Sequence, residues 1–145
     1  MILNTDEAPP VEILLVEDNP GDHRLTKEAL HEGKVYNNLH WAKDGVEAID
    51  FLKRRGAHAN APRPDIILLD LNLPKKDGRE VLSEIKQDED LRAIPVVILT
   101  SSREENDLAK GYQLGANAYV VKSSFDQSSL IEVIQKLTGT GYPQT

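Results

Sequence analysis

The sequence contains no cysteine, which excludes disulfide scaffolds, thiolate zinc sites and cysteine nucleophiles. It also has no apolar run of membrane-spanning length, and its N-terminus lacks the basic stretch and apolar core of a signal peptide. Excess positive charge is missing too, because 17 Lys and Arg stand against 24 Asp and Glu, a formal net charge of −7. We therefore expect a cytoplasmic protein without a membrane segment and without a nucleic-acid-binding face.

The composition that is present is that of a folded domain. The 145 residues are 39% hydrophobic and 28% charged, which is too apolar for a disordered chain. This length is typical of one domain. We expect residues 11–137 to form that domain, between a flexible N-terminal segment of residues 1–10 and a short C-terminal tail of residues 138–145.

Short apolar runs alternate with stretches of helical spacing along the chain. Four runs rich in β-branched residues predict buried strands, and a fifth segment with alternating polarity predicts a strand at a sheet edge. The buried runs are 11–16, 66–69, 96–99 and 118–121, and the edge segment is 39–42. Because strand and helix alternate five times, we predict a doubly wound α/β fold in which helices cover both faces of a parallel sheet.

Five helices are predicted from apolar residues that recur every three or four positions. Those positions are Leu25, Ala29 and Leu30; Val46, Ile49 and Leu52; Val81, Leu82 and Ile85; Leu108, Ala109 and Tyr112; and Leu130, Ile131, Ile134 and Leu137. Two aspartates are placed to cap helix starts, Asp44 and Asp126. Four glycines lie where a left-handed residue would end a helix, namely Gly33, Gly56, Gly115 and Gly139.

Polar side chains follow the predicted strands at the edge where such folds bind ligands. They are Glu17, Asp18, Asp70, Thr100 and Lys122. Taken singly, each has an ordinary explanation as a turn, a loop cap or a solvated residue. Together they would gather like-charged carboxylates in one crevice, which is costly without a cation. The combination therefore favours a functional site.

Such a set of side chains suits phosphoryl transfer onto a carboxylate. Oxygen ligands from Asp18 and Asp70 suit Mg²⁺, a hard cation that bridges to phosphate. Asp70 is the expected nucleophile, because a central strand end would present its oxygen to an incoming phosphorus. Thr100 and Lys122 would then contact the phosphoryl oxygens and neutralise their charge.

Four segments carry a resemblance to a known family: ILLVEDN at 13–19, PDIILLDLNLPKKDG at 64–78, PVVILTSS at 95–102 and GANAYVVK at 115–122. Together they resemble the receiver domain of two-component response regulators, over about residues 11–137. The resemblance implies a flavodoxin-like sheet of order 2-1-3-4-5 with five helices. It also implies that Asp70 accepts phosphate from a sensor histidine kinase and that the protein hydrolyses its own aspartyl phosphate without being a stand-alone enzyme.

The same resemblance assigns the metal ligands. It implies that Mg²⁺ is bound by Asp18, Asp70 and the backbone carbonyl of Asn72, with Glu17 acting through water.

The resemblance also assigns the switch residues. Thr100 and Lys122 would sense the phosphoryl group, and Tyr119 would turn inward when Thr100 moves. Plain packing at the sheet edge is the alternative role for Tyr119. One position departs from the family pattern, because receivers usually have a proline with a cis peptide where Ser123 follows Lys122. A cis peptide before a residue other than proline is costly, so we expect the loop after Lys122 to store strain or to be rearranged.

Three longer segments look like the small regulators that are paired with bacterial phytochromes: 17–30, 44–52 and 61–82. In that group the receiver stands alone and commonly forms homodimers through the face built from the fourth helix, the fifth strand and the fifth helix. Here that face would include Leu108, Tyr112, Tyr119 and Phe125, with burial in the monomer as the alternative for most of them.

Other functions stay open at this point. Instead of relaying a signal by protein contact, the protein could shuttle its phosphoryl group to a histidine phosphotransfer protein. A receiver that only binds partners would have lost an acid, and none is lost at Glu17, Asp18 or Asp70. A phosphatase of the haloacid dehalogenase type would need a second acid at Asn72. The four histidines have no metal-ligand spacing and are expected at the surface: His23, His31, His40 and His58.

Overall fold

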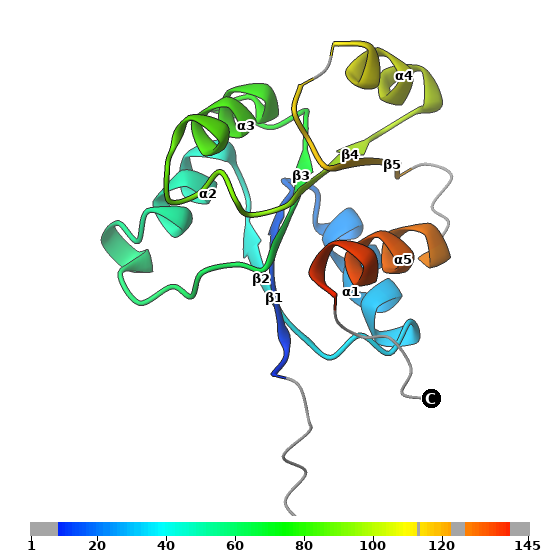
Figure 1. The fold of residues 1–145 in the computed structure, drawn as a ribbon, viewed down its shortest axis with the longest axis horizontal. Coiled ribbons are helices and arrows are strands. Elements are labelled where there is room, and N and C mark those ends of the chain that lie inside the picture. Colours follow the sequence, from blue (N-terminus) through cyan, green and yellow to red (C-terminus); the bar gives the residue numbers. More distant parts are fainter. Residues whose placement is uncertain (1–8, 113, 123–126, 140–145) are drawn as a thin grey trace, which may run out of the picture.

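Five strands and five α-helices alternate along the chain in a computed structural model that describes residues 9–112, 114–122 and 127–139 (Figure 1). The strands are β1 (Val11–Val16), β2 (Asn37–Ala42), β3 (Ile66–Asp70), β4 (Val96–Thr100) and β5 (Ala118–Val121). The α-helices are α1 (Pro20–Glu32), α2 (Gly45–Leu52), α3 (Gly78–Gln87), α4 (Arg103–Gly111) and α5 (Gln127–Thr138), and a 3₁₀ helix, η1 (Gly56–His58), follows α2.

The strands form one parallel sheet of order β2-β1-β3-β4-β5. Helices α2, α3 and α4 lie on one face of the sheet, and α1 and α5 lie on the other (Figure 1). This arrangement confirms the predicted doubly wound fold and its strand order. Within the described ranges, no helix combines the length and the apolar character needed to cross a membrane.

Two hydrophobic layers hold the sheet between its helices. Along β1, Leu14 and Val16 join the layer under α2 and α3, whereas Ile13 and Leu15 join the layer under α1 and α5. Neighbouring residues of a strand point to opposite faces, so a continuous apolar run is what a strand buried on both faces requires. The same alternation recurs in β3 and β4, whose residues are all buried.

The predicted edge strand is confirmed as β2, although it starts two residues earlier than the alternation indicated. Its polar start pairs with β1 through the backbone, with Asn37 opposite Val11 and Asn38 opposite Glu12. The Asn38 side chain also donates a hydrogen bond to Glu12 Oε2 at 2.8 Å. Backbone pairing does not depend on side-chain polarity, so the apolar pattern could not mark this boundary.

Helix starts follow the capping rules where the structure describes them. Asp44 caps α2 as predicted, since its Oδ1 accepts a hydrogen bond from the Glu47 backbone N–H at 2.8 Å. Asn19 caps α1 in the same way, accepting from the Asp22 N–H at 3.0 Å. The predicted cap Asp126 lies outside the described residues.

The prediction that Gly33 ends α1 in a left-handed conformation is wrong. Its φ is −77°, and the following residue, Lys34, takes the positive φ of 57°. Glycine is required at position 33 for a different reason, because a Cβ there would come within 2.6 Å of the Ile131 side chain on α5. The other three predicted positions do have positive φ: Gly56, Gly115 and Gly139.

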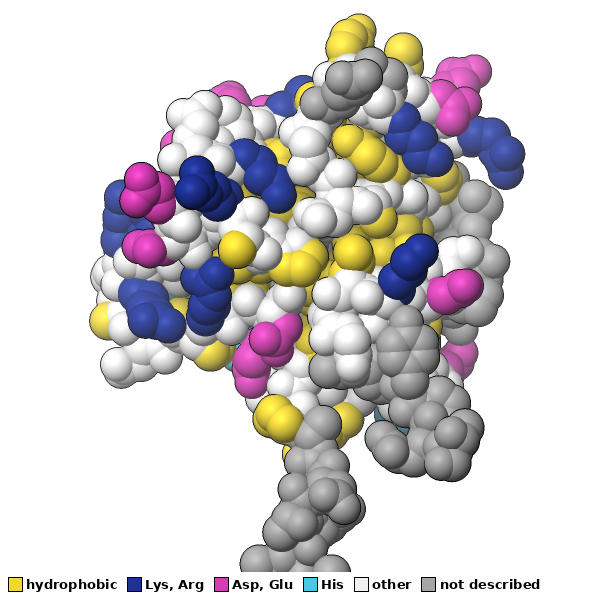
Figure 2. Space-filling view, viewed as in Figure 1, with side chains coloured by type: hydrophobic (Ala, Val, Ile, Leu, Met, Phe, Trp, Pro, Cys, Tyr) yellow, Lys and Arg dark blue, Asp and Glu magenta, His cyan; other side chains and the backbone are white. Residues whose placement is uncertain are grey.

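Several apolar positions of the predicted helices are exposed rather than buried. The largest exposed fractions among them are 61% for Leu108 and 71% for Tyr112, both from the end of α4. Leu25 on α1 and Val46 on α2 are exposed as well. Hydrophobic side chains reach the surface over α4 at the top of Figure 2. Burial in the monomer therefore does not explain Leu108 and Tyr112.

Gly78, the first residue of α3, allows this helix to start against the end of β3. A Cβ at this position would overlap the Asp70 carbonyl oxygen and lie 2.6 Å from the Leu71 Cα. We expect Gly78→Ala to lower the free energy of unfolding by about 1–3 kcal/mol, because backbone atoms must shift to make room. Urea unfolding followed by circular dichroism measures the change.

The exposed α3 residue Ser83 offers a control, since Ser83→Ala should change stability by less than about 0.5 kcal/mol. Equal stabilities of Gly78→Ala and Ser83→Ala would contradict the close packing of α3 on Asp70.

Candidate functional site

The carboxyl ends of β1, β3, β4 and β5 meet at one edge of the sheet because these strands are parallel. One carboxylate oxygen from each of Glu17, Asp18 and Asp70 lies within 4.8 Å of the other two. Glu17 and Asp70 are buried, and Asp18 is exposed. In the part of the chain that the structure describes, this is the one group of three or more His, Asp or Glu residues whose side chains come close enough to share a metal ion.

Lys122 lies at the centre of this acidic cluster. Its Nζ donates hydrogen bonds to Glu17 Oε1, Asp22 Oδ2 and Asp70 Oδ2, each at 2.9 Å. An ammonium group has three N–H donors, and all three are used here. Burial alone would lower the pKa of Lys122, but the hydrogen bonds that its ammonium donates to Asp70, Glu17 and Asp22 overcome burial and raise it. Lys122 is therefore held as a cation in the protein interior.

Asp70 is held from two sides at the last position of β3. Its Oδ1 accepts a hydrogen bond from the Asn72 backbone N–H at 2.9 Å, and its Oδ2 accepts from Lys122. The Asn72 side chain turns away and donates to Glu105 on α4 at 3.0 Å. Because the carboxylate is buried and both its oxygens are oriented, Asp70 has few conformations available to it.

Glu17 is only 1% exposed, so burial acts strongly on its carboxyl group. Loss of solvation, together with the nearby Asp70 carboxylate, raises the pKa of Glu17 to about 7, although the Lys122 ammonium opposes the shift. The acidic edge thus holds more negative charge than one lysine neutralises. A divalent cation would relieve the remaining repulsion.

The backbone at Glu17 is braced by an aromatic pair. Trp41, near the end of β2, donates its indole N–H to the Glu17 carbonyl oxygen at 2.6 Å. The His23 ring stacks on Trp41 with the ring centres 4.0 Å apart. This pair ties the loop after β1 to both α1 and β2. Like His40 and His58, His23 is partly exposed at the surface.

Thr100 is fully buried at the end of β4 and connects the site to its neighbours. Its Oγ1 lies 3.1 Å from Asn106 Oδ1 on α4 and 3.4 Å from the Val120 carbonyl oxygen of β5. Asn106 is itself buried, so this hydrogen bond gives a partner to the buried Thr100 hydroxyl and to the buried Asn106 Oδ1. Tyr119 is partly buried on β5 and packs against the hydrophobic layer that includes Ala109 of α4.

The structure adds three side chains to those predicted for the site: Asp22, Trp41 and Asn106. Asn106 had a sequence signal, because it lies three residues before the buried Ala109 and is therefore a polar residue on the apolar face of a helix. Asp22 and Trp41 had none, since their contacts with Lys122 and Glu17 join separate elements.

Some predicted features lie outside the described residues. These are the Lys122–Ser123 peptide and the side chain of Phe125.

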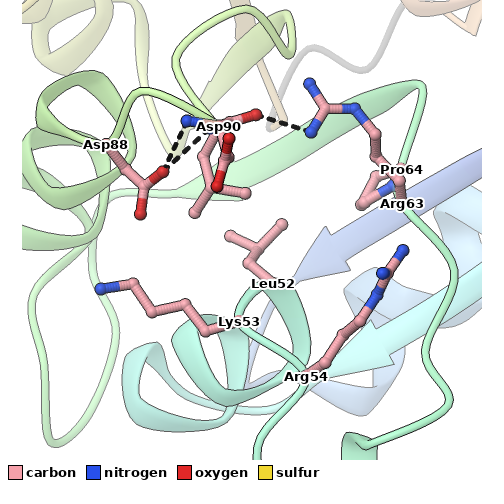
Figure 3. Close-up of a pocket in the computed structure, with 8 residues that line it drawn as sticks. Leu52, Lys53, Arg54, Arg63, Pro64, Asp88 and Asp90 are labelled. Carbon is pink, nitrogen blue, oxygen red and sulfur yellow. Dashed lines mark hydrogen bonds between the residues drawn. The ribbon is translucent and has the colours of Figure 1, made fainter.

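A separate pocket of about 430 Å³ lies at the opposite edge of the sheet (Figure 3). It is lined by Leu52, Lys53, Arg54, Arg63, Pro64, Asp88, Asp90 and Leu91. Two of its arginines are tied to loop backbone, since Arg63 donates to the Asp90 carbonyl at 2.6 Å and Arg54 donates to the Ala61 carbonyl at 2.9 Å. The surface of α2 and the connection after it is rich in Lys and Arg on the left of Figure 2. These residues lie away from the acidic edge and take no part in it.

Comparison with known proteins identifies the family. The sequence profile described as the response regulator receiver domain matches residues 13–135. The chain belongs to this family. The resemblance found in the sequence is therefore confirmed.

The chain is similar to several response regulators, two of which are described as regulators of phytochromes. Response regulator Rcp1 of Synechocystis sp. is 50% identical over 121 residues, which span 83% of this chain and 82% of the relative. The solved structure of the phosphorylated cyanobacterial phytochrome response regulator RcpA has a TM-score of 0.76 at 46% identity, and the match covers 93% of this chain and 98% of the RcpA chain. The structure of the bacteriophytochrome response regulator AtBRR has a TM-score of 0.83 at 46% identity, and the match covers 95% of this chain and 99% of AtBRR.

A solved structure also shows Rcp1 in a Mn²⁺-bound form, with a TM-score of 0.76 at 45% identity over 93% of this chain and 100% of that one. Receiver domains thus bind divalent metal ions, and the acidic cluster of this chain has the oxygen donors that such ions prefer.

The raised pKa of Glu17 predicts how stability depends on pH without metal. Between its ordinary value of 4.5 and about 7, the folded protein keeps a proton that the unfolded chain has lost. Stability therefore falls as the pH rises through this window. Glu17→Gln carries no titrating group, so its stability relative to wild type should rise by roughly 1–3 kcal/mol from pH 5 to pH 8.

Urea unfolding in EDTA at both pH values measures this difference. The exposed α1 residue Glu28 provides the control, because Glu28→Gln removes the same charge and should leave the pH dependence as in wild type. If the free energies of unfolding of Glu17→Gln and wild type change in parallel with pH, the raised pKa of Glu17 is refuted.

Proposed function

We propose that the protein is a cytoplasmic response regulator that accepts a phosphoryl group on Asp70 from a sensor histidine kinase and relays the signal by protein–protein contact. The observation that carries this proposal is the Lys122 ammonium hydrogen-bonded to Asp70 beside the carboxylates of Glu17 and Asp18. A nucleophilic carboxylate, a fixed cation and an oxygen-rich metal cluster are the groups that phosphoryl transfer to an aspartate requires.

In the proposed reaction, a carboxylate oxygen of Asp70 attacks the phosphorus of a phosphohistidine. The new P–O bond forms as the P–N bond breaks, and the electron pair leaves with the imidazole of the kinase. One N–H of Lys122 moves from Asp70 Oδ2 to a phosphoryl oxygen and offsets its charge. Water later attacks the same phosphorus, the P–O bond to Asp70 breaks, inorganic phosphate leaves and the Asp70 carboxylate is restored, so that the protein hydrolyses its own aspartyl phosphate.

The residues fit a bound Mg²⁺ ion. Asp18, Asp70 and the backbone carbonyl of Asn72 would hold it, with Glu17 acting through water. The ion would neutralise the carboxylates and the developing charge on the phosphoryl oxygens. Oxygen atoms of three acids within 4.8 Å of one another support this assignment.

Thr100 and Tyr119 are the proposed switch. On phosphorylation the Thr100 hydroxyl would turn from Asn106 and Val120 to a phosphoryl oxygen, and Tyr119 would move into the space beside it. The buried pair of Thr100 and Asn106 supports this role, because Asn106 loses its partner when Thr100 moves and α4 must adjust.

The proposed partners are a phytochrome kinase and a second copy of the chain. The descriptions of RcpA as a phytochrome response regulator and of AtBRR as a bacteriophytochrome response regulator support the kinase assignment. For the homodimer, the proposed contact is the face of α4, β5 and α5, where Leu108 and Tyr112 are exposed beside Glu104 and Asp107.

Acetyl phosphate tests the phosphoacceptor directly. In Mg²⁺, intact mass should show one added phosphoryl group on wild type and none on Asp70→Asn, because only the carboxylate is nucleophilic. Asp18→Asn should accept phosphate but need more Mg²⁺. The exposed Asp90 at the opposite edge provides a control, since Asp90→Asn should react at the wild-type rate.

Labelling of Asp70→Asn as fast as wild type would reject Asp70 as the acceptor. If wild type takes up neither phosphate nor fluoroberyllate, the protein is a binding module instead. Transfer of the label to histidine phosphotransfer proteins would identify a phosphoryl shuttle.

The dimer face has its own test by sedimentation velocity, with and without fluoroberyllate. We expect Tyr112→Ser to reduce the dimer fraction at least severalfold, because the exposed ring would lose its buried contact with the partner copy. Leu25→Ser, which removes an exposed apolar side chain from α1, is the matched control and should sediment as wild type. Unchanged dimerisation of Tyr112→Ser would place the interface elsewhere.

A further inference from the structure

Asp22 is a third carboxylate on the Lys122 ammonium. It lies in the first turn of α1, and its Oδ2 is 2.9 Å from Lys122 Nζ, as close as the Glu17 and Asp70 oxygens. Its side chain is 32% exposed, whereas those of Glu17 and Asp70 are 1% and 5% exposed. Asp22 therefore reaches Lys122 from the solvent side of the site.

The backbone of Asp22 is held on both sides. Its N–H donates to Asn19 Oδ1 at 3.0 Å, and its carbonyl accepts a hydrogen bond from the buried Thr26 hydroxyl at 3.0 Å. The carboxylate thus extends from a fixed point toward Lys122. This contact is part of the ordered start of α1 and does not come from a freely moving surface side chain.

Its charge acts on Asp70 through their shared partner. Because Asp22 Oδ2 and Asp70 Oδ2 each lie 2.9 Å from the same nitrogen, they are within twice that distance of each other. At this separation a negative charge attracts a divalent cation to the site and repels an incoming phosphoryl group. It also retains one of the three N–H donors that Lys122 could offer to phosphoryl oxygens.

We propose that Asp22 is a positioning residue that holds Lys122 and sets a balance between metal affinity and phosphoryl acceptance. The inference rests on the proposed function, since it assigns Asp22 a part in that reaction. With Asp22 present, the metal ion binds more tightly and the phosphoryl group enters more slowly. Without its charge, Lys122 is freer to follow the phosphoryl oxygens and the metal ion binds less tightly.

The test reaction uses acetyl phosphate as the phosphoryl donor. A carboxylate oxygen of Asp70 forms a bond to phosphorus, the bond from phosphorus to the acetyl oxygen breaks, and acetate leaves with the electron pair. Lys122 remains protonated throughout. Asp22 exchanges no atom or electron, so its effect on the rate must come through charge and through the position of Lys122.

Asp22→Asn separates charge from shape, because asparagine keeps an oxygen that can accept the Lys122 hydrogen bond. Trp41 reports metal binding by fluorescence, since it is the only tryptophan and its N–H contacts the Glu17 carbonyl. Relative to wild type, we expect Mg²⁺ to bind roughly threefold to tenfold more weakly to this variant, and acetyl phosphate to react roughly twofold to fivefold faster at saturating Mg²⁺.

Two further variants control the experiment. Glu28→Gln removes one charge from an exposed position of the same helix and should leave the Mg²⁺ affinity and the rate within about twofold of wild type. Asp22→Glu keeps the charge and should restore the slower rate and tighter metal binding toward the wild-type values.

Weaker Mg²⁺ binding together with a faster reaction in Asp22→Asn supports the proposed balance between metal affinity and phosphoryl acceptance. Damage to the start of α1 would instead lower both the Mg²⁺ affinity and the reaction rate. A fall in both, or no change in either, overturns the inference. Wild type serves as the separate check on the proposed function. If wild type reacts but Asp22→Asn matches it in both measurements, only the role of Asp22 fails, whereas a wild type that takes up no phosphate ends both proposals.

Discussion

The Lys122 ammonium is the contact on which the acidic edge of the sheet depends. Buried carboxylates are costly unless they are paired, and Glu17 and Asp70 are both almost fully buried. One cation satisfies an oxygen of each of them and of Asp22, which joins the loop after β1, the start of α1 and the end of β3. The junction of these elements and the orientation of the Asp70 carboxylate therefore have the same physical cause.

Hydrogen bonds also connect this edge to α4 by two short routes. Thr100 contacts Asn106, and Asn72 donates to Glu105, which in turn accepts from Ser101. A change of partners at the site must therefore be taken up by the first half of α4. Leu108 lies in the second half of α4 and Tyr112 directly follows this helix, so the surface proposed for the partner copy includes the same helix that contacts the site.

Much of this molecule could be predicted from local patterns. Apolar runs located the strands because both faces of a central parallel strand are buried, and the position of Asp70 and Thr100 after such runs placed them at one edge of the sheet. Local patterns failed where a contact joins distant segments. Gly33 is a glycine because Ile131 of α5 packs on it, and Leu108 occupies a helical apolar position that no other part of the described monomer covers.

The sequence by itself determined the alternation of strands and helices, the strand order through the family resemblance, and the set of acids, hydroxyl and lysine at the strand ends. These follow from short-range periodicity and from motifs that are contiguous in the chain. Only the tertiary structure decided that Asp22 shares Lys122, that Trp41 braces Glu17 and that Asn106 pairs with Thr100. Such contacts depend on the crossing of separate elements and on side-chain orientation, which residue spacing along the chain does not specify.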